Sequence, residues 1–512
     1  MPDNLLLTKL FASNPRQAKL AFFLLGALLM LSFAPFGWYP LAPILLLPLL
    51  QSFLVSSPRT AAAHGFWFGA GLFLTGTYWL YISVHVFGQA PLILAIFLML
   101  ALVVIMGLYY AAAGWLTARL CEGREMRLLI VAPAVWVSIE WIRGWFLSGF
   151  PWMSLGYGQI DSPLVGFAPL LGVYGVSLAV MLSATALFLA VTLRRQLRLP
   201  FAAIALLPWV GGFFLQDIQW TEAAGPAVKT TIVQGGVSQD RKWLPEQFQP
   251  TLDLYRRSLL SHADSQLVVW PEVAIPSVVD QVEPYIDILQ NDLGARDQTL
   301  MFGILERNVD EQRVYNSVVL LDGVGRQIYR KRHLVPFGEY FPVPDFVRSW
   351  MRLMSLPNSN ISPGDDVQPL LKTHDGHSLS VAICYEDAYG AEQLYALPET
   401  SILINVSNDA WFGDSIAPHQ HLEIARMRAV EVGRPVVRAT NTGISTFIAA
   451  NGDLRGMVPQ FSQETVTEEV VPRQGMTPYA KTGNTPVIVL VLIIVACFGR
   501  LSYFASRNRS TD

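Results

Sequence analysis

Three side chains with complementary chemistry follow or close apolar runs in this 512-residue sequence. Cys384 closes one such run, and Glu272 and Lys331 each follow another. A thiolate is a nucleophile, a carboxylate can take and return its proton, and an ammonium favours the thiolate and stabilises a developing oxyanion. Taken singly, a strand-end cysteine is more often part of a core, and a lysine in a charged run is usually solvated. Together the three residues indicate acyl transfer through a thioester.

The segments around these residues predict an α/β fold. Uninterrupted apolar strands that alternate with helical patterns are typical of sheets covered by helices. In such folds the functional site lies beyond the carboxyl ends of the strands, which is where all three residues fall. Strands are expected at 229–234, 266–270, 299–305, 317–321, 327–330, 379–384, 401–406 and 436–439, with a turn pair over 444–452, and helices at 244–261, 285–293 and 419–432.

The composition is too apolar for an ordinary soluble protein, with 52% hydrophobic and 15% charged residues. We predict a membrane domain with seven transmembrane helices over 1–215, a catalytic domain over 216–485, and an eighth transmembrane helix with a tail over 486–512. In isolation, any one of the apolar stretches could be a buried helix of a soluble protein. The stretches lie at 18–34, 38–55, 63–84, 91–116, 128–146, 164–193, 201–215 and 486–504, and the seventh is the weakest because it is short and contains Pro208.

Basic residues in alternate connections predict how these spans are oriented. Lys and Arg precede the first stretch and recur in every second connection, whereas the connections around 36–37, 85–90 and 147–163 contain none. Basic loops stay on the cytoplasmic side, so both termini should be cytoplasmic. With seven spans before it, the domain over 216–485 must then lie on the opposite side of the membrane.

The cysteine and histidine content narrows the chemistry further. Cys384 is the only one of three cysteines in the predicted catalytic domain, so no disulfide can form within that domain. A lone thiol in an oxidising compartment is a liability unless it is used or well buried. His419 and His421 have the wrong spacing for a metal site on one helix face, and no phosphate loop or basic nucleic-acid stripe is visible. We therefore expect no metal, no cofactor and no nucleic-acid partner.

Four motifs resemble those of the nitrilase superfamily, in the same order along the chain. They are Trp270-Pro271-Glu272, the segment KRHLVPFGE over 331–339, Cys384-Tyr385-Glu386, and the segment SNDAWF over 407–412. With the eight apolar stretches, they resemble the membrane-bound branch of that superfamily, the apolipoprotein N-acyltransferases. The resemblance covers the whole chain. It implies an α-β-β-α sandwich that is periplasmic and anchored in the bacterial inner (cytoplasmic) membrane.

The resemblance also implies roles for the residues of these motifs. Glu272 would be the general base, Lys331 its electrostatic partner and Cys384 the nucleophile. Glu339 would be a supporting carboxylate that orients the lysine or the incoming amine. The alternative for Glu339 is a surface charge in a turn, which is the less favoured interpretation.

Five further residues are candidates for supporting the site or contacting substrate. The backbone N–H of Tyr385 could complete an oxyanion hole with the neighbouring ammonium, and Glu386 follows it in the same motif. Trp243 and Trp411 are candidates for acyl-chain contact, with core packing as the competing explanation. Asn316 matches a family motif and either binds substrate or fixes a loop.

The family resemblance further implies the reaction and both substrates. A membrane phospholipid would donate a fatty acyl chain to Cys384 as a thioester. The α-amino group of the N-terminal diacylglyceryl-cysteine of an apolipoprotein would then accept it in a ping-pong scheme. Two alternatives remain open: a membrane-tethered nitrilase-type amidase or hydrolase that acts on small C–N substrates, and a membrane protein without catalytic activity.

We assign no catalytic role to two further features of the sequence. Apolar residues at helical spacing between Pro344 and Pro357 predict either a lid that dips into lipid or an amphipathic core helix. Glu140 and Arg143 lie three residues apart in the fifth apolar stretch. They could pair within the membrane, or Arg143 could extend its charge to the interface.

Overall fold

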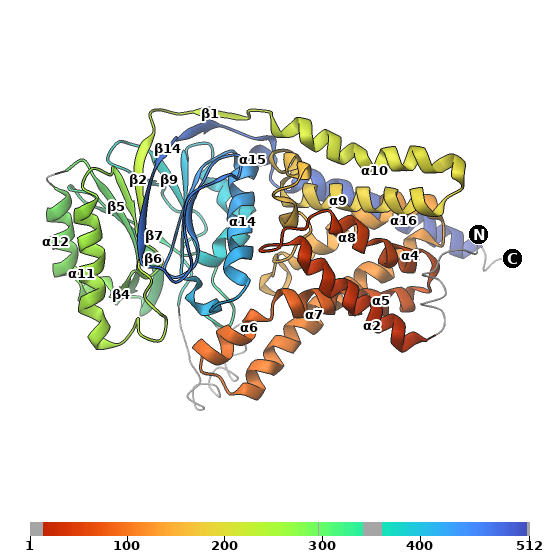
Figure 1. Cartoon of the computed structure of the whole chain (residues 1–512), viewed down its shortest axis with the longest axis horizontal. Helices are drawn as coiled ribbons and strands as arrows, with labels where there is room; N and C mark the ends of the chain where they lie inside the picture. Colours follow the sequence, from red (N-terminus) through yellow and green to blue (C-terminus); the bar gives the residue numbers. More distant parts are fainter. Residues whose placement is uncertain (1–13, 295, 341–360, 509–512) are drawn as a thin grey trace. The chain divides into compact units, whose positions relative to one another are not determined.

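The structure is a computed structural model that describes residues 14–294, 296–340 and 361–508 (Figure 1). The chain divides into two compact units. The helical unit takes its residues from Met1–Tyr81, Pro91–Ile218 and Thr482–Asp512, and the mixed unit takes them from Ile82–Ala90 and Gln219–Lys481. The main divisions fall close to the predicted domain boundaries. The short segment Ile82–Ala90, which connects two helices of the helical unit, belongs with the mixed unit and was not expected there.

Helices occupy all eight of the apolar stretches. Among the described residues, four helical segments are long and apolar enough to cross a membrane, and a fifth span results if Pro58–Gly76 and Trp79–Phe87, bent by 53°, are one broken span. The count of eight spans therefore stays a prediction. The four are Leu92–Cys121, Pro163–Thr192, Arg195–Gln216 and Thr485–Tyr503. In chain order the helices of this unit are α2 (Pro15–Leu29), α3 (Leu41–Leu45), α4 (Leu47–Val55), α5 (Pro58–Gly76), α6 (Trp79–Tyr81), α7 (Leu92–Cys121), α8 (Glu125–Arg143), α9 (Ala168–Thr192), α10 (Arg195–Gln216) and α16 (Thr485–Asn508).

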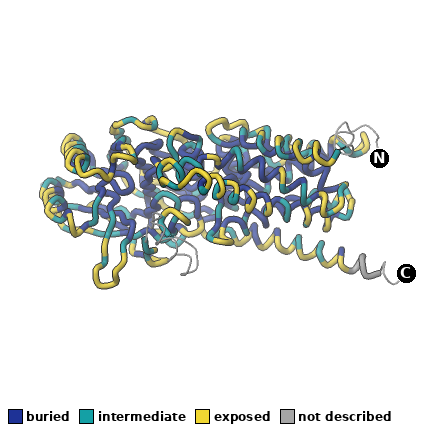
Figure 2. Tube along the Cα trace, turned by 90° about the horizontal axis from the view of Figure 1, so that it is seen from below, coloured by how far each residue is buried: buried dark blue, intermediate teal, exposed yellow. Residues whose placement is uncertain are grey.

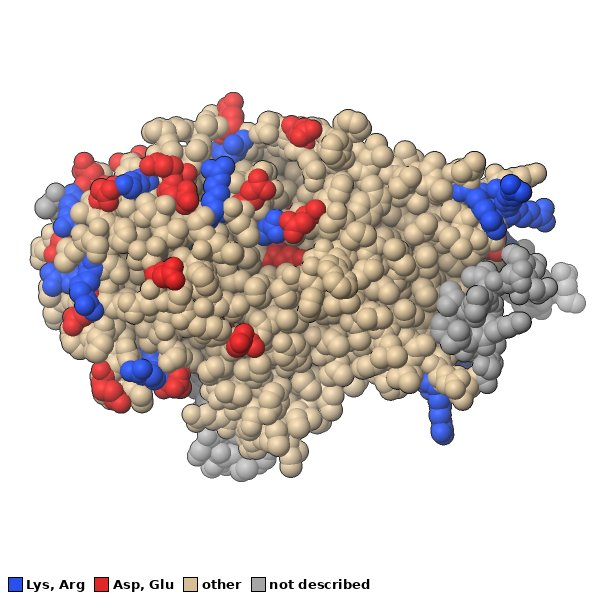
Figure 3. Space-filling model, in the orientation of Figure 1, with Lys and Arg blue, Asp and Glu red and all other residues tan. Residues whose placement is uncertain are grey.

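Large apolar side chains face outward on this unit. Ile93 on α7 is 83% exposed and Leu199 on α10 is 82% exposed. Figure 2 shows exposed residues along much of the helix that leads to the C-terminus. In Figure 3 the charged side chains visible on this unit are mainly Lys and Arg. An apolar surface of this extent is typical of contact with lipid.

Glycine residues allow α2 and α5 to pack backbone to backbone. A Cβ atom at Gly26 on α2 would collide with the carbonyl group of Phe68 on α5, and one at Gly71 on α5 would collide with the carbonyl group of Phe23 on α2. Small residues at helix contacts are typical of membrane proteins, where lipid tails remove the hydrophobic drive and close packing must replace it.

The charged pair on α8 ties this helix to the loop that follows it. Glu140 accepts hydrogen bonds from Trp136 Nε1 at 3.0 Å and from the backbone N of Leu155 at 2.9 Å. Arg143 donates to the carbonyl O of Phe150 at 2.7 Å and to Ser154 Oγ at 3.1 Å. Both charged residues are buried. The structure shows no salt bridge that joins Glu140 to Arg143 directly, and each of them binds the loop through some of its polar atoms.

The mixed unit contains two sheets that pack face to face. Parallel pairing of β2 with β3 and of β3 with β5 forms the centre of one, and parallel pairing of β9 with β10 and of β10 with β11 forms the centre of the other. The first sheet has the order β14 (Glu464–Val470), β2 (Val228–Gln234), β3 (Leu267–Val269), β5 (Thr299–Asn308), β6 (Arg313–Leu321), β7 (Arg326–Arg330), with β4 (Ile275–Val278) beside β5. The second has the order β13 (Leu454–Val458), β12 (Ser445–Ile448), β11 (Val436–Thr440), β10 (Ile402–Ser407), β9 (Ser378–Ile383), β8 (Leu371–Lys372).

Helices cover the outer face of each sheet, as Figure 1 shows. Helices α11 (Pro245–Ser261) and α12 (Glu283–Leu293) share a hydrophobic core with the first sheet, and α14 (Ala417–Val432) shares one with the second. The predicted α-β-β-α sandwich is therefore confirmed. A two-stranded ribbon of β1 (Thr221–Ala223) and β15 (Arg473–Gly475) lies outside both sheets.

Each expected strand and helix overlaps an observed one, but several strands were missed. Strand β14 is one of them, and it pairs antiparallel with β2 along its whole length. Its sequence, Glu464-Thr-Val-Thr-Glu-Glu-Val470, contains charged residues, as is typical of a strand at a sheet edge. It was missed because strands were predicted only from apolar runs. The short strands β1, β4, β8, β13 and β15 were missed for the same reason or because they span few residues.

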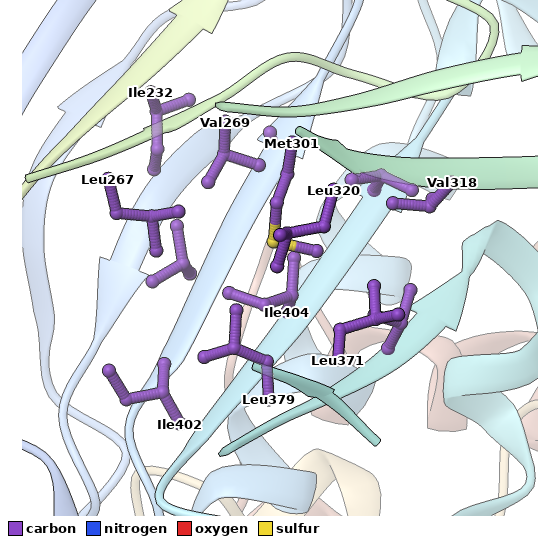
Figure 4. Close-up of a cluster of buried hydrophobic side chains, with 14 of the residues drawn as sticks. Ile232, Leu267, Val269, Met301, Val318, Leu320, Leu371, Leu379, Ile402 and Ile404 are labelled. Atoms are coloured by element: carbon purple, nitrogen blue, oxygen red, sulfur yellow. The ribbon is translucent and has the colours of Figure 1, made fainter. Parts of the chain in front are cut away.

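The core between the two sheets holds the strand ends in place. Aliphatic side chains from both sheets interdigitate there, and Figure 4 shows ten of them labelled. Burying each such side chain contributes about 1.5–3 kcal/mol, as an upper estimate. Those labelled are Ile232, Leu267, Val269, Met301, Val318 and Leu320 from the first sheet, and Leu371, Leu379, Ile402 and Ile404 from the second. The ends of β3, β7 and β9, which lead to the three candidate residues, are thereby fixed relative to one another.

The backbone around Glu272 passes directly over Gly303 on β5, and this close contact leads to a testable prediction. A Cβ atom at position 303 would lie 2.6 Å from Glu272 Cα and 2.7 Å from the carbonyl O of Pro271. Gly303→Ala should therefore displace backbone rather than a flexible side chain, and should lower stability by about 1–3 kcal/mol. Thermal unfolding of the purified protein in detergent measures this loss.

Gly325→Ala is the matched control, because a Cβ atom there would meet nothing within 4 Å. It should leave the unfolding temperature unchanged. An unfolding temperature for Gly303→Ala equal to that of Gly325→Ala would contradict the close contact at position 303.

Candidate active site

The three candidate residues each follow a strand of the two-sheet core. Glu272 follows β3 after Pro271, whose missing N–H ends the strand pairing. Lys331 follows β7, and Cys384 follows β9 and opens the short helix η7 (Cys384–Ala388). The backbone of Cys384 has φ +53°, a left-handed conformation that costs a non-glycine residue about 1–2 kcal/mol. This sharp turn separates the strand from the helix and leaves the thiol at their junction.

Lys331 is the centre of a buried group of charges. Its Nζ atom lies 2.9 Å from Glu339 Oε2 and 3.7 Å from Glu272 Oε1. Asn316 Nδ2 donates to both carboxylates, at 2.7 Å to Glu272 Oε1 and at 3.0 Å to Glu339 Oε1. Glu339 Oε2 also accepts from the backbone N of Val335 at 2.8 Å. Two carboxylates thus share one ammonium, and an amide bridges them.

The carboxylates keep this lysine protonated. Burial alone would lower the pKa of Lys331, but the charges of Glu339, Glu272 and Cys384 outweigh it and raise the pKa well above its usual value. The side chain is 1% exposed, so water contributes little to this balance. Lys331 is therefore a cation at neutral pH.

Cys384 rests as a thiol in this site. Burial raises the pKa of its thiol, the carboxylate of Glu272 raises it further, and the ammonium of Lys331 lowers it by too little to compensate. The ammonium thus acts on the thiol in the expected direction, but burial and the carboxylate outweigh it. Part of the Cys384 surface remains exposed, so a reactant can reach it. The thiol must lose its proton during attack, and the Glu272 carboxylate is the acceptor whose charge acts on it most strongly.

Glu386 joins the loop that carries Lys331 to the turn that carries Cys384. Its carboxylate accepts hydrogen bonds from the backbone N atoms of Arg332 at 2.7 Å, His333 at 3.2 Å and Ile383 at 2.7 Å. The hydroxyl of Tyr329 donates to both oxygens, at 3.1 Å and 3.2 Å. Because these donors come from β7, from the loop after it and from the end of β9, one buried carboxylate fixes the distance between the amine and the thiol.

The surroundings of Asn316 and of the two tryptophans bear on alternatives that the sequence left open. Asn316 is buried and its amide binds the site carboxylates, so it organises the site. Trp243 is 52% exposed and Trp411 is 41% exposed, so neither packs in a core. Their contact with an acyl chain stays a prediction. The segment between Pro344 and Pro357, which is the lid candidate, lies outside the described residues.

Segment Ile82–Ala90 contacts the loop that carries the fourth motif. Ser83 Oγ donates to the carbonyl O of Trp411 at 2.8 Å, and the ring of Phe87 packs edge-on against the Trp411 indole with centroids 6.5 Å apart. Both partners belong to the mixed unit. A stretch between two apolar helices thereby supports a loop beside the site.

Lys242 is a second buried amine that our sequence reading did not single out. Its Nζ atom donates to the carbonyl O of Glu272 at 3.3 Å. Burial lowers the pKa of Lys242 to about 8, and the Glu272 carboxylate only partly opposes that shift. In the sequence it follows Asp240 and Arg241 and therefore resembles a solvated charged run. Only the neighbouring Trp243 marked this segment as unusual.

Asp409 and His421 were also missed as site residues, although Asp409 lies in the fourth motif. Burial would raise the pKa of Asp409, but its interactions with His421 and Arg438 outweigh burial and hold the pKa at about 2. Arg438 Nη2 lies 2.9 Å from Asp409 Oδ2. Within residues 14–294, 296–340 and 361–508, no group of three or more His, Cys, Asp or Glu side chains could hold a metal ion.

Two family models match the chain. The N-terminal domain of apolipoprotein N-acyltransferase matches residues 25–186, and carbon-nitrogen hydrolase matches residues 229–479. An apolipoprotein N-acyltransferase of Methylococcus capsulatus is 40% identical over 488 residues, which cover 94% of this chain and 96% of that protein. One of Nitrosomonas europaea is 38% identical over 500 residues, which cover 96% and 98%. Among solved structures, Saccharomyces cerevisiae Nit3, of branch 10 of the nitrilase superfamily, has a TM-score of 0.38 and 20% identity over 49% of this chain and 93% of Nit3.

The carboxylate of Glu386 generates the second prediction. Glu386→Gln replaces one acceptor oxygen by an NH2 group. This group cannot accept a hydrogen bond from a backbone N–H, so at least one buried donor loses its partner. Stability should fall by about 2 kcal/mol or more. Thermal unfolding in detergent checks this loss.

Glu392→Gln is the control, because Glu392 is a partly exposed carboxylate that contacts His333 at the surface. This variant should lower stability far less. Equal losses for the two variants would show that Glu386 does not join the loops.

Lys242 generates a prediction about pH. Its folded-state pKa of about 8 lies below the ordinary value of 10.5, so the unfolded chain binds the proton more tightly. Stability should therefore rise by about 3 kcal/mol as the pH increases from 8 through 10.5. Lys242→Met should lose this part of the pH dependence.

Denaturant unfolding at pH 7.5 and at pH 10, in the same detergent, measures this difference between variant and wild type. Lys372→Met is the control for the loss of a lysine, because Lys372 is exposed on β8, and it should keep the wild-type pH dependence. An unchanged pH dependence in Lys242→Met would show that Lys242 is not held in a buried charged form.

Proposed function

The chain belongs to the apolipoprotein N-acyltransferase family, and from that premise we propose that Cys384 carries a fatty acyl chain between two lipid substrates. The donor is a membrane phospholipid. The acceptor is the α-amino group of the N-terminal diacylglyceryl-cysteine of an apolipoprotein, and the reaction completes lipoprotein maturation. The observation that carries this proposal is the buried group of Lys331, Glu272 and Glu339 beside a strained Cys384, in a chain that is similar to acyltransferases over nearly its whole length.

In the first half-reaction Glu272 removes the proton from the Cys384 thiol as the sulfur attacks the ester carbonyl of the phospholipid. The carbonyl oxygen becomes negative, and the ammonium of Lys331 and the backbone N–H of Tyr385 stabilise it. One such donor is worth about 3 kcal/mol in known oxyanion holes. Glu272 then returns the proton to the leaving glycerol oxygen, and lysophospholipid departs. The acyl-enzyme thioester remains.

In the second half-reaction the neutral α-amino group of the apolipoprotein attacks the thioester. Glu272 accepts the proton that the amine loses and passes it to the departing sulfur, which restores the thiol and the resting enzyme. The same oxyanion stabilisers act again, so one site serves both substrates in turn. Glu339 keeps Lys331 in place in both steps, because it offers a full negative charge at 2.9 Å.

We propose the arrangement in the membrane on the basis of the charge pattern. Residues 1–215 provide seven transmembrane helices, residues 216–485 provide the periplasmic catalytic domain, and residues 486–512 provide an eighth helix and a cytoplasmic tail. Both termini lie on the cytoplasmic side of the bacterial inner membrane. The apolar outer surface of the helical unit and the basic connections between its helices support this arrangement.

A tethered amidase of small C–N substrates is not favoured. Similarity to the acyltransferases extends over the membrane helices as well as the carbon-nitrogen hydrolase part, and it covers 94% of this chain for the Methylococcus capsulatus relative. An enzyme for small soluble amides would need no helical unit of this size.

Mass spectrometry of the purified protein after incubation with phospholipid alone tests the proposed reaction. We expect one fatty acyl group on Cys384, its release by a diacylglyceryl-cysteine peptide, and no acyl group in Cys384→Ser. Glu272→Gln should slow thioester formation by about 10²-fold or more, because the thiol then lacks its base. Cys497→Ser is the matched control for losing a cysteine, because Cys497 is exposed on α16, and it should retain full acylation.

Acyl groups on any residue other than Cys384 would overturn the assignment of the nucleophile. Release of ammonia or acid from small amides, without an acyl-enzyme from phospholipid, would favour the amidase alternative.

A further inference from the structure

His421 on α14 lies against the backbone of the nucleophile. Its Nε2 atom is 3.1 Å from the carbonyl O of Cys384, and its Nδ1 atom is 2.9 Å from Asp409 Oδ1. The imidazole is 1% exposed. It therefore bridges the backbone of the nucleophile and a buried carboxylate without access to water.

The two contacts determine how many protons the imidazole carries. A backbone carbonyl oxygen can only accept, so Nε2 must donate. Asp409 is ionised, because Arg438 Nη2 lies 2.9 Å from one of its oxygens and Ser407 Oγ donates to the other at 2.8 Å. An ionised carboxylate can only accept, so Nδ1 must donate as well. An imidazole that donates from both nitrogens is a cation.

Buried charged groups surround His421. Asp409 is its closest carboxylate, and Asp387 is a second nearby carboxyl whose pKa burial raises and the neighbouring His421 lowers in part. Arg438 lies on the far side of Asp409 and donates to Asn405, and Asn405 in turn donates to the carbonyl O of Ala382 at 3.2 Å. Ala382 belongs to β9, so the charged cluster is anchored to the strand that carries the nucleophile.

A hydrogen bond to the Cys384 carbonyl also fixes the N–H group of Tyr385. The peptide bond between the two residues is planar, and in its trans form the C=O and N–H bonds point in opposite directions. Holding the carbonyl on the α14 side therefore directs the N–H of Tyr385 to the opposite side. A charged donor on the carbonyl also polarises the amide and strengthens its N–H as a donor. The strained φ of +53° at Cys384 makes such a restraint necessary, because the turn would otherwise relax.

We propose that His421, held as an imidazolium by Asp409, is a positioning residue that orients the Cys384–Tyr385 peptide so that the Tyr385 N–H stabilises the oxyanion. This inference rests on the proposed function, because the oxyanion arises in both of its half-reactions. His421 contacts neither substrate and acts through the peptide. Its role therefore differs from that of Lys331, which places its own charge next to the reacting oxygen.

Two reactions of the same thiol separate this role from a general contribution to folding. Acylation by phospholipid passes through an oxyanion, whereas alkylation by iodoacetamide displaces iodide and forms none. His421→Phe keeps a ring of similar size and removes both donors. It should slow thioester formation and transfer to a diacylglyceryl-cysteine peptide by about 10²-fold each, with KM for phospholipid and the alkylation rate of Cys384 little changed. His421→Gln, which can still donate to the carbonyl, should recover part of the loss.

His419→Phe is the matched control. His419 is half-buried two residues earlier on the same helix and contacts Gln460, so this variant should behave as wild type in all assays. A parallel fall in acylation and alkylation for His421→Phe would show that His421 only supports the fold, and unchanged acylation would show that it has no role. Both results overturn the inference. Absence of a thioester in wild type would instead overturn the proposed function.

Nitrogen NMR of protein labelled with ¹⁵N-histidine tests the charge of His421 without any variant that must remain active. We expect both ring nitrogens of His421 to be protonated at neutral pH, with the signals assigned by their loss in His421→Gln. A signal from an unprotonated ring nitrogen would overturn the inference, because one of the two contacts would then lack its proton.

Discussion

The structure depends on one constraint: a buried ammonium must be paired. Lys331 is removed from water, and an unpaired charge there would cost several kcal/mol. Glu339 and Glu272 supply the compensating charge, and Asn316 satisfies both of them at once. These residues come from strand ends and loops of the first sheet, so the pairing requires that sheet to be formed before the group can exist. A site of this kind is rigid, because moving any member leaves a buried charge without a partner.

The nucleophile joins this group from the other sheet. The apolar core between the sheets fixes the strands, and Glu386 fixes the loops at their ends. Cys384 then faces a carboxylate and an ammonium whose effects on its thiol oppose each other, and burial decides the balance in favour of the neutral thiol. A lone thiol that rests protonated is protected from oxidation, since the thiolate is the reactive form.

Buried polar contacts extend from the reacting atoms into the fold. Behind Cys384, Asp409 pairs with Arg438 and contacts the imidazole of His421, and the imidazole contacts the backbone of the nucleophile. Behind Glu272, Lys242 binds the carbonyl group of the same residue. Segment Ile82–Ala90 supports the loop that carries Trp411, although it is flanked by helices of the helical unit. The proposed acyl transfer thus relies on contacts that no single motif contains.

The sequence by itself determined the division into apolar and mixed segments, the alternation of strands and helices, and the three side chains at strand ends. These properties are local, because periodicity and the ends of apolar runs are written in neighbouring residues. Tertiary structure alone decided that Lys242 is buried, that Glu386 joins two loops, that β14 completes a sheet edge and that Cys384 rests as a thiol. Each of these depends on partners far away in the chain and on the exclusion of water. Burial and pairing are properties of the folded chain, and no short stretch of sequence specifies them.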